Sequence, residues 1–182
     1  SRVDELVKRV RDVAREVKRI NDELLKRVEE VIKESRDRVR ELLKKVEDVI
    51  RRAAEEIDRI RRDREVVKDL LRRLKEDVDE VIKDNERLLE EVKRIVEDVV
   101  RKAEKTLEDL RKIVEDVIRD LDRDRAKEVV REIEKLLEDV RRTSEDTVRK
   151  IRELVAEVDD DHRRASETIR RLLKEAEDRA RK

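Results

Sequence analysis

The residues of this chain that could do chemistry surround its one histidine. His162 lies in the stretch EVDDDHRRAS, with Asp159 three residues before it and Ser166 four residues after it. At these spacings the three side chains share one face of a helix. An acidic residue three positions before a histidine is half of a carboxylate-bridged dinuclear metal motif. Ser166, His162 and Asp159 are also the residue types of a nucleophilic triad.

The rest of the sequence supports neither chemistry. A dinuclear metal site needs a second copy of the motif, and the chain has a single histidine. A triad on adjacent turns of one helix has neither an oxyanion hole nor a substrate pocket. Without cysteine there is no thiolate ligand or nucleophile, and without glycine there is no phosphate-binding loop. We therefore predict no catalytic residue, no metal site and no cofactor, and a protein that is not an enzyme.

The charge balance bears on the partners of the protein. Charged residues make up 58% of the 182 residues, with 53 Lys and Arg against 53 Asp and Glu, and aromatic residues are absent. Nucleic-acid binders and proteins that bind anionic membranes carry a basic excess, and single-stranded nucleic acids are bound by aromatic stacking. No apolar run approaches the ~20 residues of a membrane span. We expect no nucleic acid, no membrane and no required partner. The expected molecule is a monomer, with self-association left open.

The apolar residues recur with a period of 18 residues, which is five full turns of an α-helix. One row along the first third of the chain contains Val3, Asn21, Val39 and Ile57. About seven such rows form a stripe that is wide enough to touch two neighbouring helices. A period of 3.6 residues imposes almost no supercoil, so the helices are expected to be nearly straight. Disorder, which a high charge content can indicate, does not fit such strict periodicity.

The apolar stripe is interrupted twice, and both interruptions contain the sequence Arg-Asp-Arg, at residues 62–64 and 123–125. Asp63 and Asp124 are suited to cap the helices that follow. We predict helices over about 2–61, 64–121 and 125–181 in one domain, 1–182. Short connections make neighbouring helices antiparallel, which gives an all-α, up-down-up three-helix bundle. The alternative is a single long helix that self-associates as a coiled-coil rod, since helix ends favour glycine and none is present.

Polar residues interrupt the apolar rows at nine positions. Seven lie within the rows and two lie at their edge: Asn21, Ser35, Asn85, Thr106, Thr147, His162 and Ser166, with Thr143 and Ser144 at the edge. Each would cost on the order of 1–3 kcal/mol if it were buried without a hydrogen-bond partner. One interpretation is that they are boundary residues, half in water. The other is that they form buried hydrogen-bond layers that fix helix pairing and register.

Folding the chain at the proposed turns brings these polar residues to common levels. Positions that sum to about 126 pair between the first two helices, and positions that sum to about 248 pair between the last two. Asn21 then lies level with Thr106 and Thr143, and Ser144 and Thr147 lie within a turn. Asn85 lies level with His162, and Ser166 is one turn further on. Ser35 has no clear partner, and we expect it to bond to a carbonyl of its own helix.

Taken together, the 18-residue rows, the charged surface, the Leu/Ile/Val core and the polar layers resemble de novo designed, parametric three-helix bundles with buried hydrogen-bond networks. The resemblance covers the whole chain. It implies a structural scaffold with no natural biochemical function and no natural localisation, soluble and produced by recombinant expression. The alternative is a designed interaction module, either a helix-exchange switch or an oligomer building block. Buried networks encode pairing specificity in such modules as well.

Overall fold

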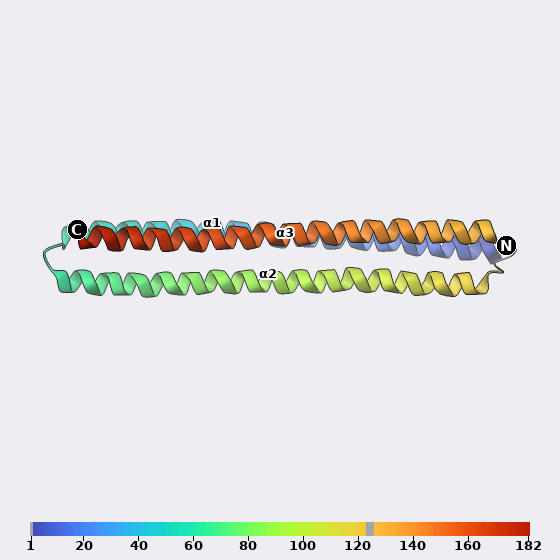
Figure 1. The fold of residues 1–182 in the computed structure, drawn as a ribbon, viewed down its shortest axis with the longest axis horizontal. Coiled ribbons are helices and arrows are strands. Elements are labelled where there is room, and N and C mark those ends of the chain that lie inside the picture. Colours follow the sequence, from blue (N-terminus) through green and yellow to red (C-terminus); the bar gives the residue numbers. More distant parts are fainter. Residues whose placement is uncertain (1, 123–125) are drawn as a thin grey trace. The chain divides into compact units, whose positions relative to one another are not determined.

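The computed structural model describes residues 2–122 and 126–182, and three long helices account for nearly all of them. They are α1 (Arg2–Arg59), α2 (Arg64–Asp120) and α3 (Lys127–Arg181), and the described residues contain no strand (Figure 1). The prediction of an all-α, three-helix fold is confirmed. The alternative of one uninterrupted helix is wrong, because the chain leaves the helical conformation between Arg59 and Arg64 and again after Asp120.

The helix ends lie within two residues of the predicted ones. α1 ends at Arg59 instead of 61, α2 ends at Asp120 instead of 121, and α3 is helical from Lys127 instead of 125. The predicted capping residue Asp63 precedes α2, and its Oδ1 accepts a hydrogen bond of 3.3 Å from the backbone N–H of Val66. This bond satisfies one of the free amides in the first turn. The other predicted cap, Asp124, lies outside the described residues.

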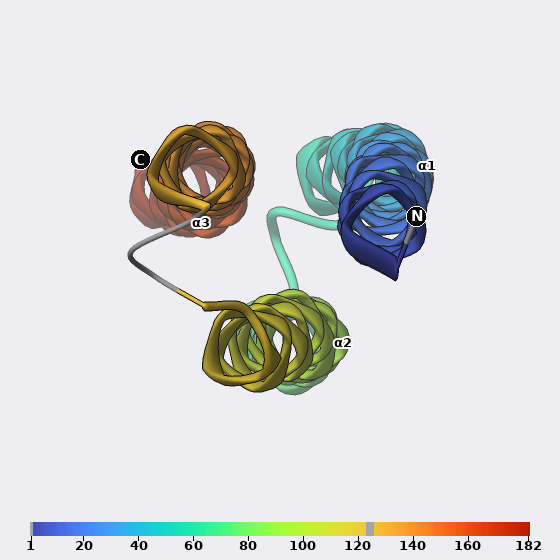
Figure 2. The ribbon, with the colours of Figure 1, turned by 90° about the vertical axis from the view of Figure 1, so that its right-hand side faces the viewer.

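The chain packs as two compact units, and each helix contributes a segment to both. The described parts of Ser1–Glu30 and Arg94–Leu154 form the first unit, and Val31–Lys93 with Val155–Lys182 form the second. In the first unit, the beginnings of α1 and α3 and the end of α2 occupy the corners of a triangle (Figure 2). That residues 1–182 form one domain stays a prediction.

In the second unit, the contacts between helices define their directions. Ser35 of α1 meets His162 of α3, and further along Asp58 meets Arg179, so α1 and α3 run the same way. Lys93 of α2 meets Asp159, whereas Asn85 meets Ser166, so α2 runs against α3. This is the up-down-up order that short connections require.

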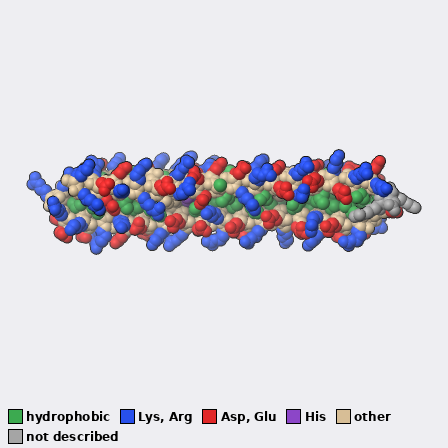
Figure 3. All heavy atoms as spheres, in the orientation of Figure 1, with side chains coloured by type: hydrophobic (Ala, Val, Ile, Leu, Met, Phe, Trp, Pro, Cys, Tyr) green, Lys and Arg blue, Asp and Glu red, His purple; other side chains and the backbone are tan. Residues whose placement is uncertain are grey.

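Each unit has an apolar core to which all three helices contribute. The first core contains nine buried residues, namely Val10, Ala14, Val17, Leu110, Val114, Val117, Leu121, Ile133 and Val140. The second contains eight, namely Val46, Ile50, Leu74, Val78, Ile82, Ile169, Leu173 and Ala176. Within a helix these positions are three, four or seven residues apart, so they fall on one face. Apolar side chains appear between the helices in Figure 3, and Lys, Arg, Asp and Glu cover the rest of the face shown.

The edge of the predicted stripe is solvent-exposed at one position. Val49 continues the row of Val13 and Val31, which are half-buried, yet 46% of Val49 is exposed. Val46, one turn earlier in α1, is 5% exposed. Both residues are valines in α1, and they differ only in how far they are buried.

This pair allows a matched test of the core. Val46→Ala removes two methyl groups from a packed site, and we expect the free energy of unfolding to fall by about 2 kcal/mol. Val49→Ala removes the same atoms from a half-exposed site and gains helix propensity, so we expect a change within about 0.5 kcal/mol. Chemical denaturation followed by helical circular dichroism measures both. Equal losses for the two variants would contradict this assignment of the core.

Candidate functional site

Seven of the nine predicted polar residues are buried in the structure. They are Asn21, Ser35, Asn85, Ser144, Thr147, His162 and Ser166, none of them more than 8% exposed. Thr106 and Thr143 are half-buried. Six of the buried residues fall into two groups, and the seventh, Thr147, bonds within its own helix. We call Ser35, Asn85, His162 and Ser166 of the second unit the His162 layer, and Asn21 with Ser144 of the first unit the Asn21 pair.

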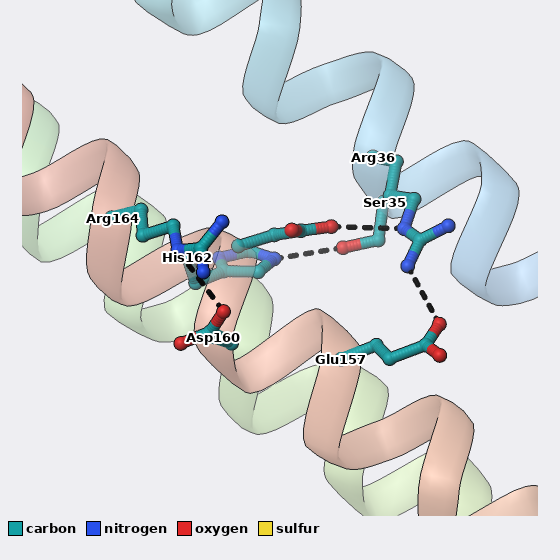
Figure 4. Close-up of polar contacts among 7 residues, drawn as sticks. Ser35, Arg36, Glu157, Asp160, His162 and Arg164 are labelled. Carbon is teal, nitrogen blue, oxygen red and sulfur yellow. Dashed lines mark hydrogen bonds and ion pairs between the residues drawn. The ribbon is translucent and has the colours of Figure 1, made fainter.

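The His162 layer connects all three helices of its unit. The Nε2 of His162 on α3 lies 2.9 Å from the Oγ of Ser35 on α1. Its Nδ1 lies 3.2 Å from the backbone carbonyl oxygen of Asn85 on α2. Figure 4 shows Ser35 and His162 reaching toward each other from α1 and α3. Both ring nitrogens are therefore hydrogen-bonded, each to a different helix.

Asn85 and His162 also exchange side chain and backbone contacts. The Asn85 Nδ2 donates to the backbone carbonyl oxygen of His162 at 3.0 Å and to the Oγ of Ser166 at 3.1 Å. The imidazole of His162 in turn bonds to the backbone carbonyl of Asn85. Each of these two side chains therefore reaches the main chain of the other residue, across the contact between α2 and α3.

The bonding pattern determines the tautomer of the histidine. The carbonyl oxygen of Asn85 can only accept, so the Nδ1 of His162 carries a hydrogen and donates it. In the neutral ring the Nε2 is then an acceptor, and the hydroxyl of Ser35 donates to it. A protonated ring would reverse this bond, and the hydroxyl of Ser35 would have to find another acceptor.

Ion pairs lie at the edge of the His162 layer. Arg36 of α1 reaches two carboxylates of α3, with Nε 2.9 Å from Asp161 Oδ2 and Nη2 2.9 Å from Glu157 Oε2; the contact with Glu157 is marked in Figure 4. On α2, Lys93 Nζ lies 3.3 Å from Asp159 Oδ1. Partly exposed pairs of this kind contribute little energy singly, but these reach α3 from both other helices.

The pKa of His162 reflects this surrounding. Burial lowers the pKa from its ordinary value of 6.5, because the charged ring would lose its water. The hydrogen bond to the Asn85 carbonyl and the carboxylates of Asp161 and Asp159 act in the opposite direction, and Lys93 lowers the pKa further. The net direction is downward, so the folded chain favours the neutral ring.

The Asn21 pair of the first unit is simpler. The Nδ2 of Asn21 on α1 donates to the Oγ of Ser144 on α3 at 2.7 Å. Its expected neighbours do not take part in this bond. Thr106 donates to the carbonyl of Lys102 at 2.7 Å, and Thr143 donates to that of Asp139 at 2.9 Å, each within its own helix.

Thr147 likewise bonds within its helix, donating to the carbonyl of Thr143 at 3.0 Å. A threonine hydroxyl in a helix reaches the carbonyl one turn back. The three threonines therefore satisfy themselves locally and do not link the helices through these bonds. The prediction that Asn21 and Ser144 lie at one level is confirmed by their hydrogen bond. The prediction that Thr106 and Thr143 are hydrogen-bond partners of Asn21 is wrong.

Ser35 also differs from its prediction, because it bonds to His162 and not to a carbonyl of its own helix. The two predicted sums together place Ser35 level with residue 157, five residues short of His162. Helical side chains lean toward the N-terminus of their helix, and the long imidazole spans much of that difference. A search for polar stripe residues within one or two turns of the calculated level would have found this contact.

One atom of each buried asparagine has no partner among the described residues. These atoms are the Oδ1 of Asn21 and the Oδ1 of Asn85. Their amide groups donate, to one acceptor in Asn21 and to two in Asn85. Hydrogen-bond geometry fixes the amide orientation of Asn85, because its Nδ2 faces a backbone carbonyl that can only accept.

The residues that could have formed a metal site or a triad are engaged elsewhere. Asp159 pairs with Lys93, Ser166 accepts from Asn85, and the ring of His162 bonds to Ser35 and to the Asn85 carbonyl. The described residues include no group of His, Cys, Asp and Glu that could hold a metal ion. Each of the hydrogen bonds described for the His162 layer joins two different helices.

Comparison with known proteins agrees with the fold. No protein-family model and no curated protein matches the chain. A solved structure described as a "Computationally designed three helix bundle" matches with a TM-score of 0.58 and 20% sequence identity. The match covers 99% of this chain and 83% of the designed one. The chain thus has the fold of a three-helix bundle. None of the helices described is long and apolar enough to cross a membrane.

The lowered pKa of His162 predicts how stability depends on pH. The unfolded chain takes up a proton near pH 6.5, whereas the folded chain takes it up at a lower pH. The free energy of unfolding should therefore fall as the pH drops below 6.5, and this contribution should level off once the folded ring is also protonated. Titration of the single imidazole by NMR should give a midpoint below 6.5.

The control for this titration is His162→Gln, which keeps a polar side chain but cannot titrate. Its free energy of unfolding should lack the decline between pH 6.5 and the midpoint measured for the folded ring. Carboxylates titrate mostly below about pH 5 and affect both proteins alike. An imidazole midpoint at or above 6.5 would contradict the effect of burial on His162.

Proposed function

We propose that the protein is a de novo designed structural scaffold, and not an enzyme, in which buried polar layers specify helix pairing and register. The observation that carries this proposal is the His162 layer, where hydrogen bonds from α3 reach both other helices of the unit. The designed origin is supported by the likeness of fold to a designed bundle. It is further supported by a composition that uses no Gly, Pro, Cys, Met, Trp, Tyr or Phe.

The physical argument rests on the difference between apolar and polar contacts. Apolar burial is non-directional, so a stripe of Val, Leu and Ile tolerates several alignments. A slip by one residue moves a side chain by about 1.5 Å along the helix and about 100° around it. After such a slip, Asn85 and His162 would no longer face each other's carbonyls. Each buried group left without a partner would cost about 1–3 kcal/mol.

An apolar version of the layer tests the proposal. Its substitutions are Ser35→Ala, Asn85→Leu, His162→Leu and Ser166→Ala together. We expect a free energy of unfolding equal to or greater than that of the parent, because apolar packing often replaces buried polar groups without loss. We also expect several registers in place of one, visible as multiple sets of methyl resonances in two-dimensional NMR.

The matched control replaces polar groups that bond within their own helix, Thr106→Val with Thr143→Val. This variant should keep the resonance pattern of the parent, because each hydroxyl donates to a carbonyl of its own helix. If the apolar layer gave a single sharp set of resonances and the parent's helix pairing, the layer would not be what specifies register.

We also propose that the molecule is a monomer. Each unit closes its apolar core with helix segments of the same chain, which leaves Val49 and Val66 as the large apolar side chains exposed in the described residues. Size-exclusion chromatography with light scattering should give 22.0 kDa at every concentration. A defined multiple of that mass would favour the alternative, an interaction module whose helices exchange between chains.

A further inference from the structure

The total charge of the chain is balanced, but part of the second unit has an excess of positive charge. The segments 59–75 and 174–182, both in the second unit, contain twelve Lys and Arg against six Asp and Glu. They bring together the first turns of α2 and the last turns of α3. An anionic ligand responds to this local charge and not to the total, because charges further away than about 8 Å are screened at physiological salt.

A groove lies between these parts of α2 and α3. Its volume is about 780 Å³, and Val67 and Leu71 of α2 with Ala180 of α3 are its apolar lining residues. Val67 is buried, while Leu71 and Ala180 are half-buried, so methyl groups remain accessible from the groove. Pockets for small ligands typically have volumes of about 300–1,000 Å³.

Cations line both sides of the groove. Arg64, Lys68, Arg72 and Lys75 recur every three or four residues of α2 and so share one of its faces. Arg61 precedes α2, and Arg181 and Lys182 come from the end of α3. Among the described lining residues, Glu177 is the one acid. Figure 3 shows Lys and Arg side chains along the apolar strip at the end of the molecule marked C in Figure 1.

Some of these cations have carboxylate neighbours, and Arg61 lies 3.3 Å from Asp58. Lys68 lies 3.9 Å from Glu65 and Arg72 lies 3.3 Å from Asp69, and all four side chains are more than half exposed. Exposed pairs of this kind contribute at most about 1 kcal/mol. An anion can therefore replace these carboxylates, provided that it also gains apolar contact with Val67, Leu71 and Ala180, which we call the floor of the groove.

We propose that this groove between α2 and α3 binds a small amphipathic anion, namely a single alkyl chain with a carboxylate or sulfate head group. The alkyl chain lies along Val67, Leu71 and Ala180, and the cations at the rim hold the head group. Arginine and lysine bind such oxyanions by charge-assisted hydrogen bonds. An inorganic anion would contact only the cations at the rim, and a neutral alkane would contact only the apolar floor. A ligand with a charged head group and an alkyl chain contacts both.

The test is a titration of methyl-labelled protein with decanoate, kept below its micelle concentration, with acetate as the head-group control. We expect saturable shifts of the methyl resonances of Val67, Leu71 and Ala180 with decanoate, and no saturation with acetate. Lys68→Gln with Arg72→Gln should weaken decanoate binding by about fivefold, since each exposed charge contributes a fraction of a kcal/mol. Ala180→Leu, which fills the floor, should weaken it as well.

The control double variant is Lys83→Gln with Arg87→Gln. It removes a lysine and an arginine at the same spacing on exposed positions of α2 in the same unit, and Arg87 is paired with Asp84 at 3.5 Å as Arg72 is with Asp69. Binding should be unchanged in this variant. Equal weakening in both double variants, equal affinity for acetate, or shifts spread over all apolar grooves would each overturn the proposal.

Discussion

Each helix carries an apolar stripe that it cannot cover by itself, and the burial of that stripe against two other helices is the interaction on which the structure depends. More than half of all residues are charged, so the stripe holds nearly all the apolar surface available for a core. The two cores are rich in the β-branched residues valine and isoleucine, which supply six of nine residues in the first and five of eight in the second and are weaker helix formers than leucine or alanine. Helix formation here therefore relies on packing between helices more than on local preference.

The buried polar groups add directional contacts to this apolar core. Apolar contacts favour burial without choosing an alignment, whereas a hydrogen bond weakens steeply when its geometry is disturbed. The two units use this differently. The His162 layer ties three helices together and includes two bonds to backbone carbonyls, while the Asn21 pair joins α1 and α3 through a single bond between side chains. The His162 layer thus links more helices, through more hydrogen bonds, than the Asn21 pair does.

The sequence predicts the helices, their order and the level of Asn21 and Asn85, because all of these follow from periodicity and chain breaks. It does not predict the partner of Ser35, since that contact depends on how far an imidazole leans along its helix and not on the level of its backbone. It also wrongly predicts that Thr106 and Thr143 are hydrogen-bond partners of Asn21. Both lie near the level of Asn21, but each has a closer acceptor, the carbonyl one turn back in its own helix. Periodicity equally misjudges Val49, because a row at the edge of a stripe passes from half-buried to exposed along one helix. The sequence pattern thus predicts which face of a helix a residue lies on and its height along the bundle. The hydrogen-bond partner depends also on side-chain length and on the acceptors available within the same helix.

The 18-residue period also has a consequence for how the chain folds. A helix displaced by 18 residues, or about 27 Å, returns its apolar rows to equivalent lines, so the stripes recognise a misaligned partner almost as well as the correct one. Collapse on apolar contacts alone would therefore lead to compact, misaligned states that must partly separate before they can rearrange. Under the proposed function, the polar layers would remove this degeneracy, because a displaced Asn85 or His162 would lose the carbonyl to which it bonds. That loss would widen the energy gap between the native state and the misaligned states, and such a gap distinguishes a funnelled landscape from a rugged one.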